Sequence, residues 1–197
     1  LKLAVESGAT HVSWYQLTIE PNTVFFRTQP ILPVDEVLED IQEQGEAYLK
    51  ANGFINYEVS AWRKEKPSAH NLNYWQFGDY LAIGAGAHGK VTQADGVYRF
   101  QKTRLPKDYL AKVPAENLQF KRLEHDDMPF EFMMNALRLN EGVKASLYAE
   151  RTGTNLSEVT ELMTSLQQRK LMVDDPTRIA CTEKGHIFLN SVLEEFL

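Results

Sequence analysis

The segment from His70 to Gly89 carries the residues best suited to chemistry in this chain of 197 residues. Its first part, HNLNYW, places the imidazole of His70 beside two amides and the aromatic rings of Tyr74 and Trp75. An imidazole flanked by aromatic rings could bind the iron of a flat metallocofactor such as haem. It could equally be a structural histidine that bonds a nearby carbonyl, so both interpretations stay open from the residues alone.

The second part of this segment is an apolar run that closes on very small residues, GDYLAIGAGAHG. Asp79–Ile83 is typical of a short buried strand, and residues 84–89 continue it with almost no side-chain bulk. Another backbone or a flat ligand can approach such residues closely. The pattern indicates either the edge of a binding pocket or a tight corner of a sheet.

Strands and a helix should position this segment. β-Branched and aromatic residues predict a strand over His11–Glu20, helical periodicity predicts a helix over 34–51, and a second strand is expected over Phe54–Ser60. Strand, helix, strand predicts a right-handed parallel crossover in an α/β fold, with a third strand over Asp79–Gly86. Glu20 ends the first strand, where α/β folds place ligands, so it is a candidate site residue. Its alternative role is a carboxylate that caps the turn before Pro21.

The second half of the chain changes character near Pro114. Residues 99–114 are expected to be a connecting segment with a short helix around 108–113. Beyond it we predict helices over 129–139, 146–152 and 156–170, a hairpin over 171–181 and a closing helix over 184–197. This is the order of a winged-helix unit, so we expect two domains, 1–115 and 118–197.

Charge and cysteine content exclude several classes of protein. The net charge is −6, and residues 118–197 hold nine Lys and Arg against thirteen Asp and Glu, which argues against nucleic-acid binding and favours a docking or lid domain. No run approaches the roughly 18 apolar residues that span a bilayer and the N-terminus has no signal pattern, so we expect a cytoplasmic protein. The single cysteine, Cys181, cannot form an internal disulfide or a multi-cysteine metal site. Leu1–Gly8 is typical of a helix that ends at a Gly cap, so we expect the chain to be a fragment of a longer protein.

Six strings in this chain, taken in order, resemble the C-terminal part of HemW-type proteins: LTIEPNTVF, GFINYEVS, HNLNYW, GDYLAIGAGAHG, CTEKGHIFLN and EEFL. These proteins are radical S-adenosylmethionine relatives of oxygen-independent coproporphyrinogen III oxidase. The resemblance covers nearly the whole chain. It implies the C-terminal part of an incomplete parallel (β/α) barrel, followed by a helical, winged-helix-like domain.

The resemblance also implies cofactors and site residues. In the longer protein a CxxxCxxC loop would bind a [4Fe–4S] cluster, and no cluster ligand or catalytic residue is expected in this chain. Gly84, Ala85, Gly86, Ala87 and His88 would line the S-adenosylmethionine pocket, largely through backbone atoms. His70, Asn71, Tyr74 and Trp75 would bind haem, with His70 as the candidate iron ligand.

Three functions follow from these expectations. The first is a haem chaperone that works with its own N-terminal radical S-adenosylmethionine half and delivers haem to a client protein, for which a membrane-associated protein is one candidate. The second is a coproporphyrinogen oxidase, which abstracts hydrogen from a propionate chain; the true oxidase lacks the HNxxYW pattern. The third is a purely structural or docking module.

Overall fold

The computed structural model describes residues 1–112 and 118–197, and this described chain divides into two compact units, Leu1–Ser68 and Ala69–Leu197. The sequence predicts a domain boundary between residues 115 and 118, whereas the compact units divide after Ser68. The His70–Gly89 segment therefore lies wholly within the second unit.

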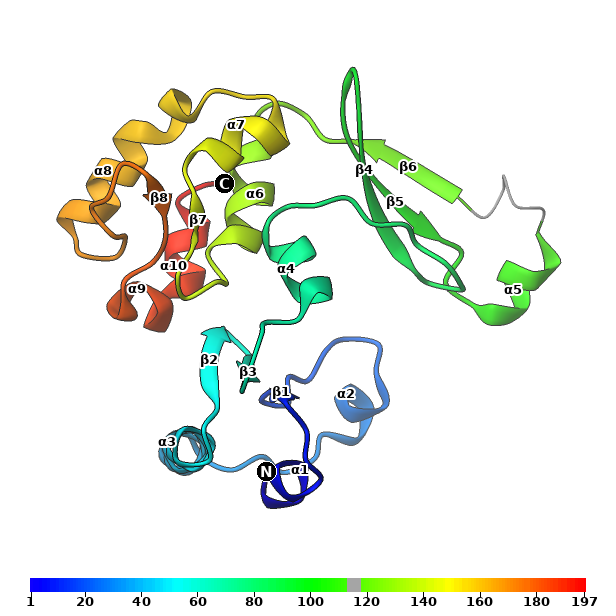
Figure 1. Ribbon diagram of the computed structural model, residues 1–197. Helices are drawn as coiled ribbons and strands as arrows, with labels where there is room; N and C mark the ends of the chain where they lie inside the picture. The colour runs from blue at the N-terminus through cyan, green and yellow to red at the C-terminus, as the bar shows by residue number, and fades with distance from the viewer. Residues whose placement is uncertain (113–117) are drawn as a thin grey trace. The chain divides into compact units, whose positions relative to one another are not determined.

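The first unit combines helices with a small sheet. Its elements in chain order are α1 (Lys2–Glu6), β1 (His11–Ser13), α2 (Val24–Thr28), α3 (Asp35–Ala51), β2 (Ile55–Glu58) and β3 (Ala61–Arg63) (Figure 1). Helix α3 confirms the helix predicted over 34–51. Its buried glycine, Gly45, has no room for a Cβ atom because the indole ring of Trp14 lies against it.

The sheet of the first unit is antiparallel, so the predicted parallel crossover is wrong. The strand order is β1-β3-β2, and both β1 and β2 pair with β3 in antiparallel fashion. The physical reason is the turn at Val59-Ser60, which reverses the chain after β2. The returning strand β3 then takes the place beside β1 that β2 was expected to occupy.

Strand β1 is also much shorter than the strand predicted over His11–Glu20. After Ser13 the only backbone bond to the sheet that the structure describes is from the Trp14 N–H to the Ser60 carbonyl, at 2.8 Å. Residues 15–20 have strand-forming side chains but form no strand with any part of the chain that the structure describes.

The second unit holds the remaining elements. They are α4 (Ala69–Trp75), β4 (His88–Gln93), β5 (Gly96–Lys102), α5 (Pro106–Ala111), β6 (Leu118–Arg122), α6 (Met128–Ala136), β7 (Val143–Lys144), α7 (Ser146–Thr152), the 3₁₀ helix η2 (Leu156–Val159), α8 (Thr160–Gln168), β8 (Arg178–Ile179), α9 (Glu183–Ile187) and α10 (Leu189–Glu194). No helix of the described residues is long and apolar enough to cross a membrane.

The second unit contains an antiparallel sheet in the order β4-β5-β6 (Figure 1). The sequence instead predicts a third parallel strand over Asp79–Gly86 and a connecting segment over 99–114. The third strand expected over Asp79–Gly86 is wrong, because that segment contributes only an isolated bridge between Tyr80 and Lys90. Gly84 and Gly86 have φ angles of +99° and +71°, values that turn the chain and that L-residues with side chains rarely adopt.

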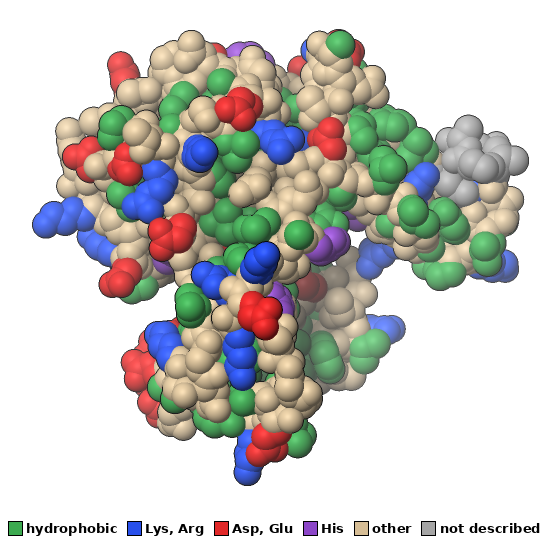
Figure 2. Space-filling view, in the orientation of Figure 1, with side chains coloured by type: hydrophobic (Ala, Val, Ile, Leu, Met, Phe, Trp, Pro, Cys, Tyr) green, Lys and Arg blue, Asp and Glu red, His purple; other side chains and the backbone are tan. Residues whose placement is uncertain are grey.

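The connecting segment expected over 99–114 is in fact most of β5 and α5. The short helix expected around residues 108–113 corresponds to α5. Its expected last residue, at position 113, lies outside the described residues. Hydrophobic side chains gather over this part of the unit in Figure 2, and Leu105, Leu110 and Phe120 are exposed there.

The helices predicted in the second half are confirmed. Helices α6 and α7 fall within one residue or so of their predicted starts, and the third predicted helix is divided into η2 and α8. The hairpin predicted over 171–181 is confirmed by the bridge between Met172 and Cys181 and by the Val173 N–H, which bonds the Ala180 carbonyl at 3.0 Å. The closing helix is divided into α9 and α10.

A row of aromatic rings ties α4 to the helices of the second unit. The ring of Phe77, which follows α4, lies edge-on to Phe132 of α6 at a centroid distance of 5.7 Å. Phe132 in turn lies edge-on to Tyr148 of α7 at 5.1 Å. All three side chains are buried, so this row fixes the position of α4 against the helices.

Candidate ligand-binding site

Helix α4 presents the aromatic pattern that the sequence singled out. His70 and Tyr74 are four residues apart and so lie on one face of the helix, with their ring centroids 4.7 Å apart and their planes at 77°. His70 is exposed and has no hydrogen-bond partner among the described residues. The interpretation of His70 as a structural histidine that bonds a carbonyl therefore finds no support in the described part of the chain.

A cavity of about 840 Å³ lies between the sheet and the helices α4 and α6. Its lining residues come from α4, strands β4, β5 and β6, α6 and the segment before β4: Tyr74, Trp75, Tyr80, His88, Gly89, Arg99, Phe100, Gln101, Gln119, Phe120, Lys121, Glu131, Met134 and Asn135. This volume falls within the range of about 300–1,000 Å³ that is usual for small-ligand pockets. Aromatic rings and polar groups meet in the same cavity, which suits a flat ligand with a polar edge.

The sheet side of the cavity follows from the strand register. His88 of β4 lies opposite Gln101 of β5, and Gln101 lies opposite Gln119 of β6. Side chains at directly opposed positions share one face of a sheet. The two glutamines bond each other at 3.0 Å, whereas His88 is exposed and has no hydrogen-bond partner within the described ranges 1–112 and 118–197.

An ion pair closes one wall of the cavity. Arg99 of β5 donates to a carboxylate oxygen of Glu131 on α6 through Nε at 3.1 Å and Nη2 at 2.6 Å. Its Nη1 donates to the hydroxyl of Tyr80 at 2.8 Å. The other cation, Lys121, is largely exposed and lies 3.6 Å from Asp127. Arg99 is therefore committed to the protein, while Lys121 can reach a ligand.

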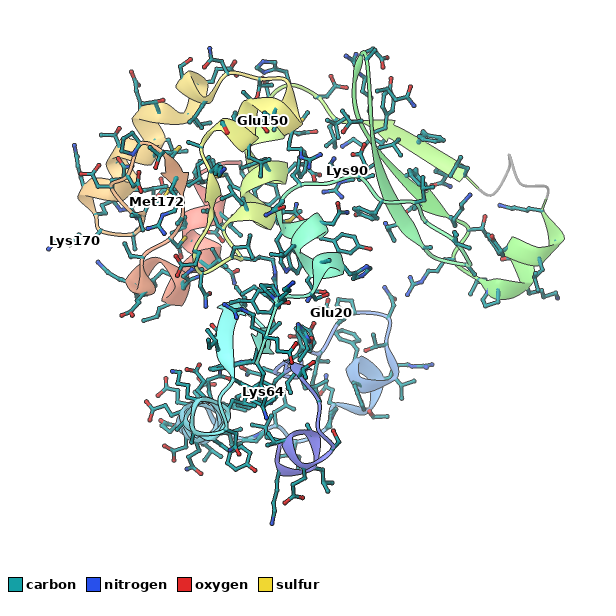
Figure 3. The ribbon with its side chains drawn as sticks, viewed as in Figure 1. Glu20, Lys64, Lys90, Glu150, Lys170 and Met172 are labelled. Atoms are coloured by element: carbon teal, nitrogen blue, oxygen red, sulfur yellow. The ribbon has the colours of Figure 1, made fainter. Side chains whose placement is uncertain are left out.

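A buried lysine holds the segment before β4 in place. The Lys90 side chain is only 1% exposed, and its Nζ donates to Asp79 Oδ1 at 2.8 Å and lies 4.2 Å from the centroid of the Phe77 ring. Burial lowers the pKa of Lys90 below its usual value, and the bond to Asp79 acts against that change. Figure 3 shows Lys90 on the side of the sheet that faces the helices.

The Trp75 ring lies against a guanidinium group, while its indole N–H lacks a hydrogen-bond acceptor among the described residues. The guanidinium carbon of Arg138 lies 4.4 Å from the centroid of its ring. Its indole N–H is buried, yet it has no hydrogen-bond partner among the residues that the structure describes. A buried donor of this kind costs about 1–3 kcal/mol unless something pairs with it.

Of the segment 84–89, His88 and Gly89 line the cavity and the four residues before them do not. Gly84, Ala85, Gly86 and Ala87 do not line the cavity. The Gly86 N–H bonds the Thr103 carbonyl at 2.9 Å, and the Ala87 carbonyl accepts from the Lys102 N–H at 2.8 Å, so part of this backbone is used within the fold.

Close approach was expected at these small residues, and it does occur at Gly89. A Cβ atom there would overlap the ring of Phe100 on the neighbouring strand. Gly84 by contrast has no atom close to the place where its Cβ would lie.

The remaining predicted residues are spread over the chain. Glu20 is exposed and lies in the first unit, where its backbone carbonyl, not its carboxylate, accepts a bond from Thr23 Oγ1 at 2.7 Å (Figure 3). Asn71 lies on α4 but does not line the cavity. The described residues contain no cluster of three or more His, Cys, Asp or Glu side chains that could hold a metal ion. Burial raises the pKa of Cys181 to about 12, which makes its thiol inert.

Sequence reasoning missed the part of the cavity lining that comes from residues 99–135. The signal was the pair Asp95-Gly96, a hairpin-turn dipeptide with alternating residues on both sides. It marks β4 and β5 as a hairpin, although the observed turn is Ala94-Asp95, and this turn sets His88 opposite Gln101.

Comparison with known proteins agrees with the motifs. Residues 123–188 match the family described as the HemN C-terminal domain. The chain is 46% identical over 200 residues to the "Heme chaperone HemW" of Haemophilus influenzae, covering all of this chain and 51% of that protein. It is 43% identical over 199 residues to the protein of the same name from Escherichia coli, again covering all of this chain and 52% of the relative. The chain thus spans about half the length of these curated relatives.

The fold also matches a solved structure. The coproporphyrinogen III oxidase HemN from Escherichia coli, described as a radical SAM enzyme, superposes with a TM-score of 0.70 over 99% of this chain and 49% of that one. The sequence identity is 17%, so this likeness concerns the fold alone.

Proposed function

We propose that this chain, which belongs to the family of HemW-type proteins, binds haem and contributes to its delivery to client proteins. The similarity to haem chaperones extends over the whole chain. Because the chain spans about half of those relatives, the activity of the whole protein is part of the proposal. Here haem is the cargo, not a resident cofactor.

The observation that carries the proposal is the environment of His70. Its ring is exposed, has no hydrogen-bond partner among the described residues and lies edge-on to Tyr74. A neutral imidazole is the commonest protein ligand for haem iron, and neighbouring aromatic rings match the apolar face of a porphyrin. We assign the iron to His70, with apolar contact from Tyr74 and Trp75 and a supporting position for Asn71.

The residues present fit such a cargo. Tyr74 and Trp75 line a cavity large enough for a small ligand, and Lys121 supplies a cation for its carboxylates. The buried indole N–H of Trp75 lacks a partner in the described chain, and an acceptor on a bound ligand or a water would satisfy it. Aromatic walls, a cation and a free donor are the groups that a carboxylated macrocycle requires.

Further cofactors belong to the longer proteins. We propose that S-adenosylmethionine contacts the chain at Gly84, Ala85, Gly86, Ala87 and His88, largely through backbone atoms, with Glu20 as a weaker candidate. The [4Fe–4S] cluster would be held by the N-terminal radical S-adenosylmethionine half, because this chain has one cysteine. Apolar side chains that are exposed in the first unit, such as Phe25, Ile31 and Val37, support an interface with that half.

Fold details at the domain level are also proposals. We assign residues 1–115 to the C-terminal part of a radical S-adenosylmethionine barrel whose parallel strands would lie elsewhere in the longer proteins, since the described strands here pair antiparallel, and residues 118–197 to a winged-helix-like domain. The order α6, β7, α7, α8 and then the hairpin supports the second assignment. The net charge of −4 in this half supports docking to a protein rather than to nucleic acid. A membrane-associated client and a cytoplasmic location stay predictions.

A haem titration separates the chaperone from the two other functions, and substrate consumption separates those two from each other. A coproporphyrinogen oxidase should consume its substrate and need not bind haem, and a structural module should bind neither. We would titrate haem into the natural protein that carries this sequence, with and without reconstituted cluster, and follow the Soret band. Saturable haem binding by the wild type supports the chaperone, and its absence contradicts it.

His70→Ala is the variant that tests the assigned ligand. We expect markedly weaker haem binding or a changed Soret band. His125→Ala is the matched control, because His125 is exposed, lies outside the cavity lining and has its ring nitrogens 3.8 Å from Asp126 and 3.4 Å from Glu158. Equal haem binding by wild type and His70→Ala would remove His70 from the site.

A further inference from the structure

His88 is an imidazole that the assignments above leave largely unused. It is the first residue of β4, it is exposed, and it lines the cavity that Tyr74 and Trp75 also line. It has no hydrogen-bond partner in the described part of the chain. His70, in contrast, is not among the residues that line the cavity.

Aromatic rings line the cavity on both sides, and the imidazole of His88 comes from the sheet. Helices α4 and α6 contribute Tyr74, Trp75 and Met134, together with the polar residues Glu131 and Asn135. The sheet contributes His88 beside the bonded pair Gln101 and Gln119, and also the rings of Phe100 and Phe120. A flat ligand between these sides would have one face against aromatic rings and the other toward an imidazole.

The charges of the cavity favour an anionic ligand. Its lining holds two permanent cations, Arg99 and Lys121, against one carboxylate, Glu131, a net of +1. Arg99 and Glu131 neutralise each other in their ion pair, which leaves Lys121 as the cation whose partner, Asp127, is 3.6 Å away at an exposed position. A ligand carboxylate can compete for a lysine held so loosely.

We infer that the cavity between the sheet β4-β5-β6 and helices α4 and α6 is the seat of the porphyrin ring, with His88 as an iron ligand on the sheet side and Lys121 as the partner of a propionate. This inference rests on the proposed haem-binding function and adds to it a site and two residues. The S-adenosylmethionine assignment of His88 concerns its backbone, so its side chain is free for this role. For a haem in this cavity, the iron is assigned to His88 in place of His70, because His70 lies beside Tyr74 but does not line the cavity.

The test is a haem titration of the natural protein carrying this sequence, in wild-type form and as His88→Ala, with His125→Ala as control. Loss of a residue that merely orients a metal ligand costs about 10- to 100-fold in metal affinity, so loss of the ligand itself should weaken binding at least about tenfold. The fold should persist, because the His88 side chain is exposed and unbonded in the described chain, and circular dichroism checks this. His125→Ala should bind as wild type does.

A second readout separates ligation from a structural role. Free imidazole added to haem-loaded His88→Ala should restore the Soret band of the wild type, because it can enter the space that the side chain leaves. Lys121→Gln should weaken binding of haem but not of haem dimethyl ester, which has no free propionate.

The outcomes can be told apart. No haem binding by the wild type would contradict the proposed function itself. Haem binding by the wild type that is unchanged in His88→Ala, or reduced without any change of the Soret band and without rescue by imidazole, would overturn the assignment of His88 while leaving haem binding in place.

Discussion

Replacing Asp79 by Asn should destabilise the unit formed by Ala69–Leu197, because it removes the carboxylate that faces the buried ammonium of Lys90. Asp79 Oδ1 accepts from Lys90 Nζ at 2.8 Å and from Thr92 Oγ1 at 2.8 Å, and Oδ2 accepts from the Thr92 backbone N–H at 2.8 Å. The aspartate thus joins the segment before β4 to the strand itself. Without it the Lys90 charge keeps only the Phe77 ring and a 3.4 Å contact to Thr92 Oγ1.

The size of the effect follows from the exposure of the two partners. Removing one partner of a fully buried ion pair costs about 3–5 kcal/mol. Lys90 is 1% exposed, but the Asp79 side chain is 43% exposed, so water can reach the ammonium once the carboxylate is gone. We therefore expect a loss of about 2 kcal/mol in the free energy of unfolding.

Urea denaturation measures this loss, and hydrogen exchange locates it. The N–H groups of Tyr80 and Lys90 bond each other's carbonyl at 2.9 and 3.0 Å, so their exchange should accelerate in Asp79→Asn. The double variant Asp79→Asn/Lys90→Met is the control, because it removes both charges and should recover most of the lost stability. A loss below about 0.5 kcal/mol, or strictly additive single and double variants, would refute this account of the ion pair.

Acid should abolish the difference between the wild type and Asp79→Asn. Burial acts to raise the pKa of Asp79, but the hydrogen bonds from Lys90 and Thr92 outweigh it and lower the pKa below the usual 3.8. The folded state then holds the carboxylate charged more readily than the unfolded chain does. Its contribution is full above pH 3.8 and is lost as the pH falls below that value. The two proteins should therefore have the same stability in strong acid.

Three further substitutions or reactions test other parts of the second unit. Glu131→Gln should cost about 1–2 kcal/mol in urea denaturation, because it leaves the half-buried guanidinium of Arg99 without its carboxylate; an unchanged midpoint would contradict this role. Gly142→Ala should cost about 2 kcal/mol or more, since φ is +63° and a Cβ would overlap the Ile179 carbonyl, and wild-type stability would contradict that clash. Cys181, with its pKa raised by burial to about 12, should resist iodoacetamide at neutral pH until urea is added, as mass spectrometry can show; alkylation of the native protein would mean that the thiol is accessible.

Helices were predictable from the sequence because their apolar residues repeat within a single segment. The pattern over 34–51 gave α3, and Ser146–Thr152 gave α7 with the same bounds. Strands were less predictable because a strand needs a partner elsewhere in the chain. Residues 15–20 have the side chains of a strand, yet the described structure gives them no neighbouring strand. The short strand β3 (Ala61–Arg63) was not predicted, and the strand expected over Phe54–Ser60 runs into the turn that precedes it. Without β3, the two expected strands were joined as a parallel crossover.

The candidate site was predictable only on its helix side. The HNLNYW pattern located α4 and its aromatic rings, because those residues are close in sequence. The sheet side depends on register. The ladder Gln93 opposite Gly96 continues to His88 opposite Gln101. The dipeptide Asp95-Gly96 signals the hairpin, but a two-residue loop at these positions would set His88 opposite Thr103. The observed turn is Ala94-Asp95, so the dipeptide gives the face of each side chain and misses its partner by two residues. His88 and Lys90 then share a face because they are two residues apart on one strand. The hairpin signal therefore predicts which side chains share a face with His88, whereas the pairing of His88 with Gln101 depends on a turn at Ala94-Asp95 that the sequence did not indicate.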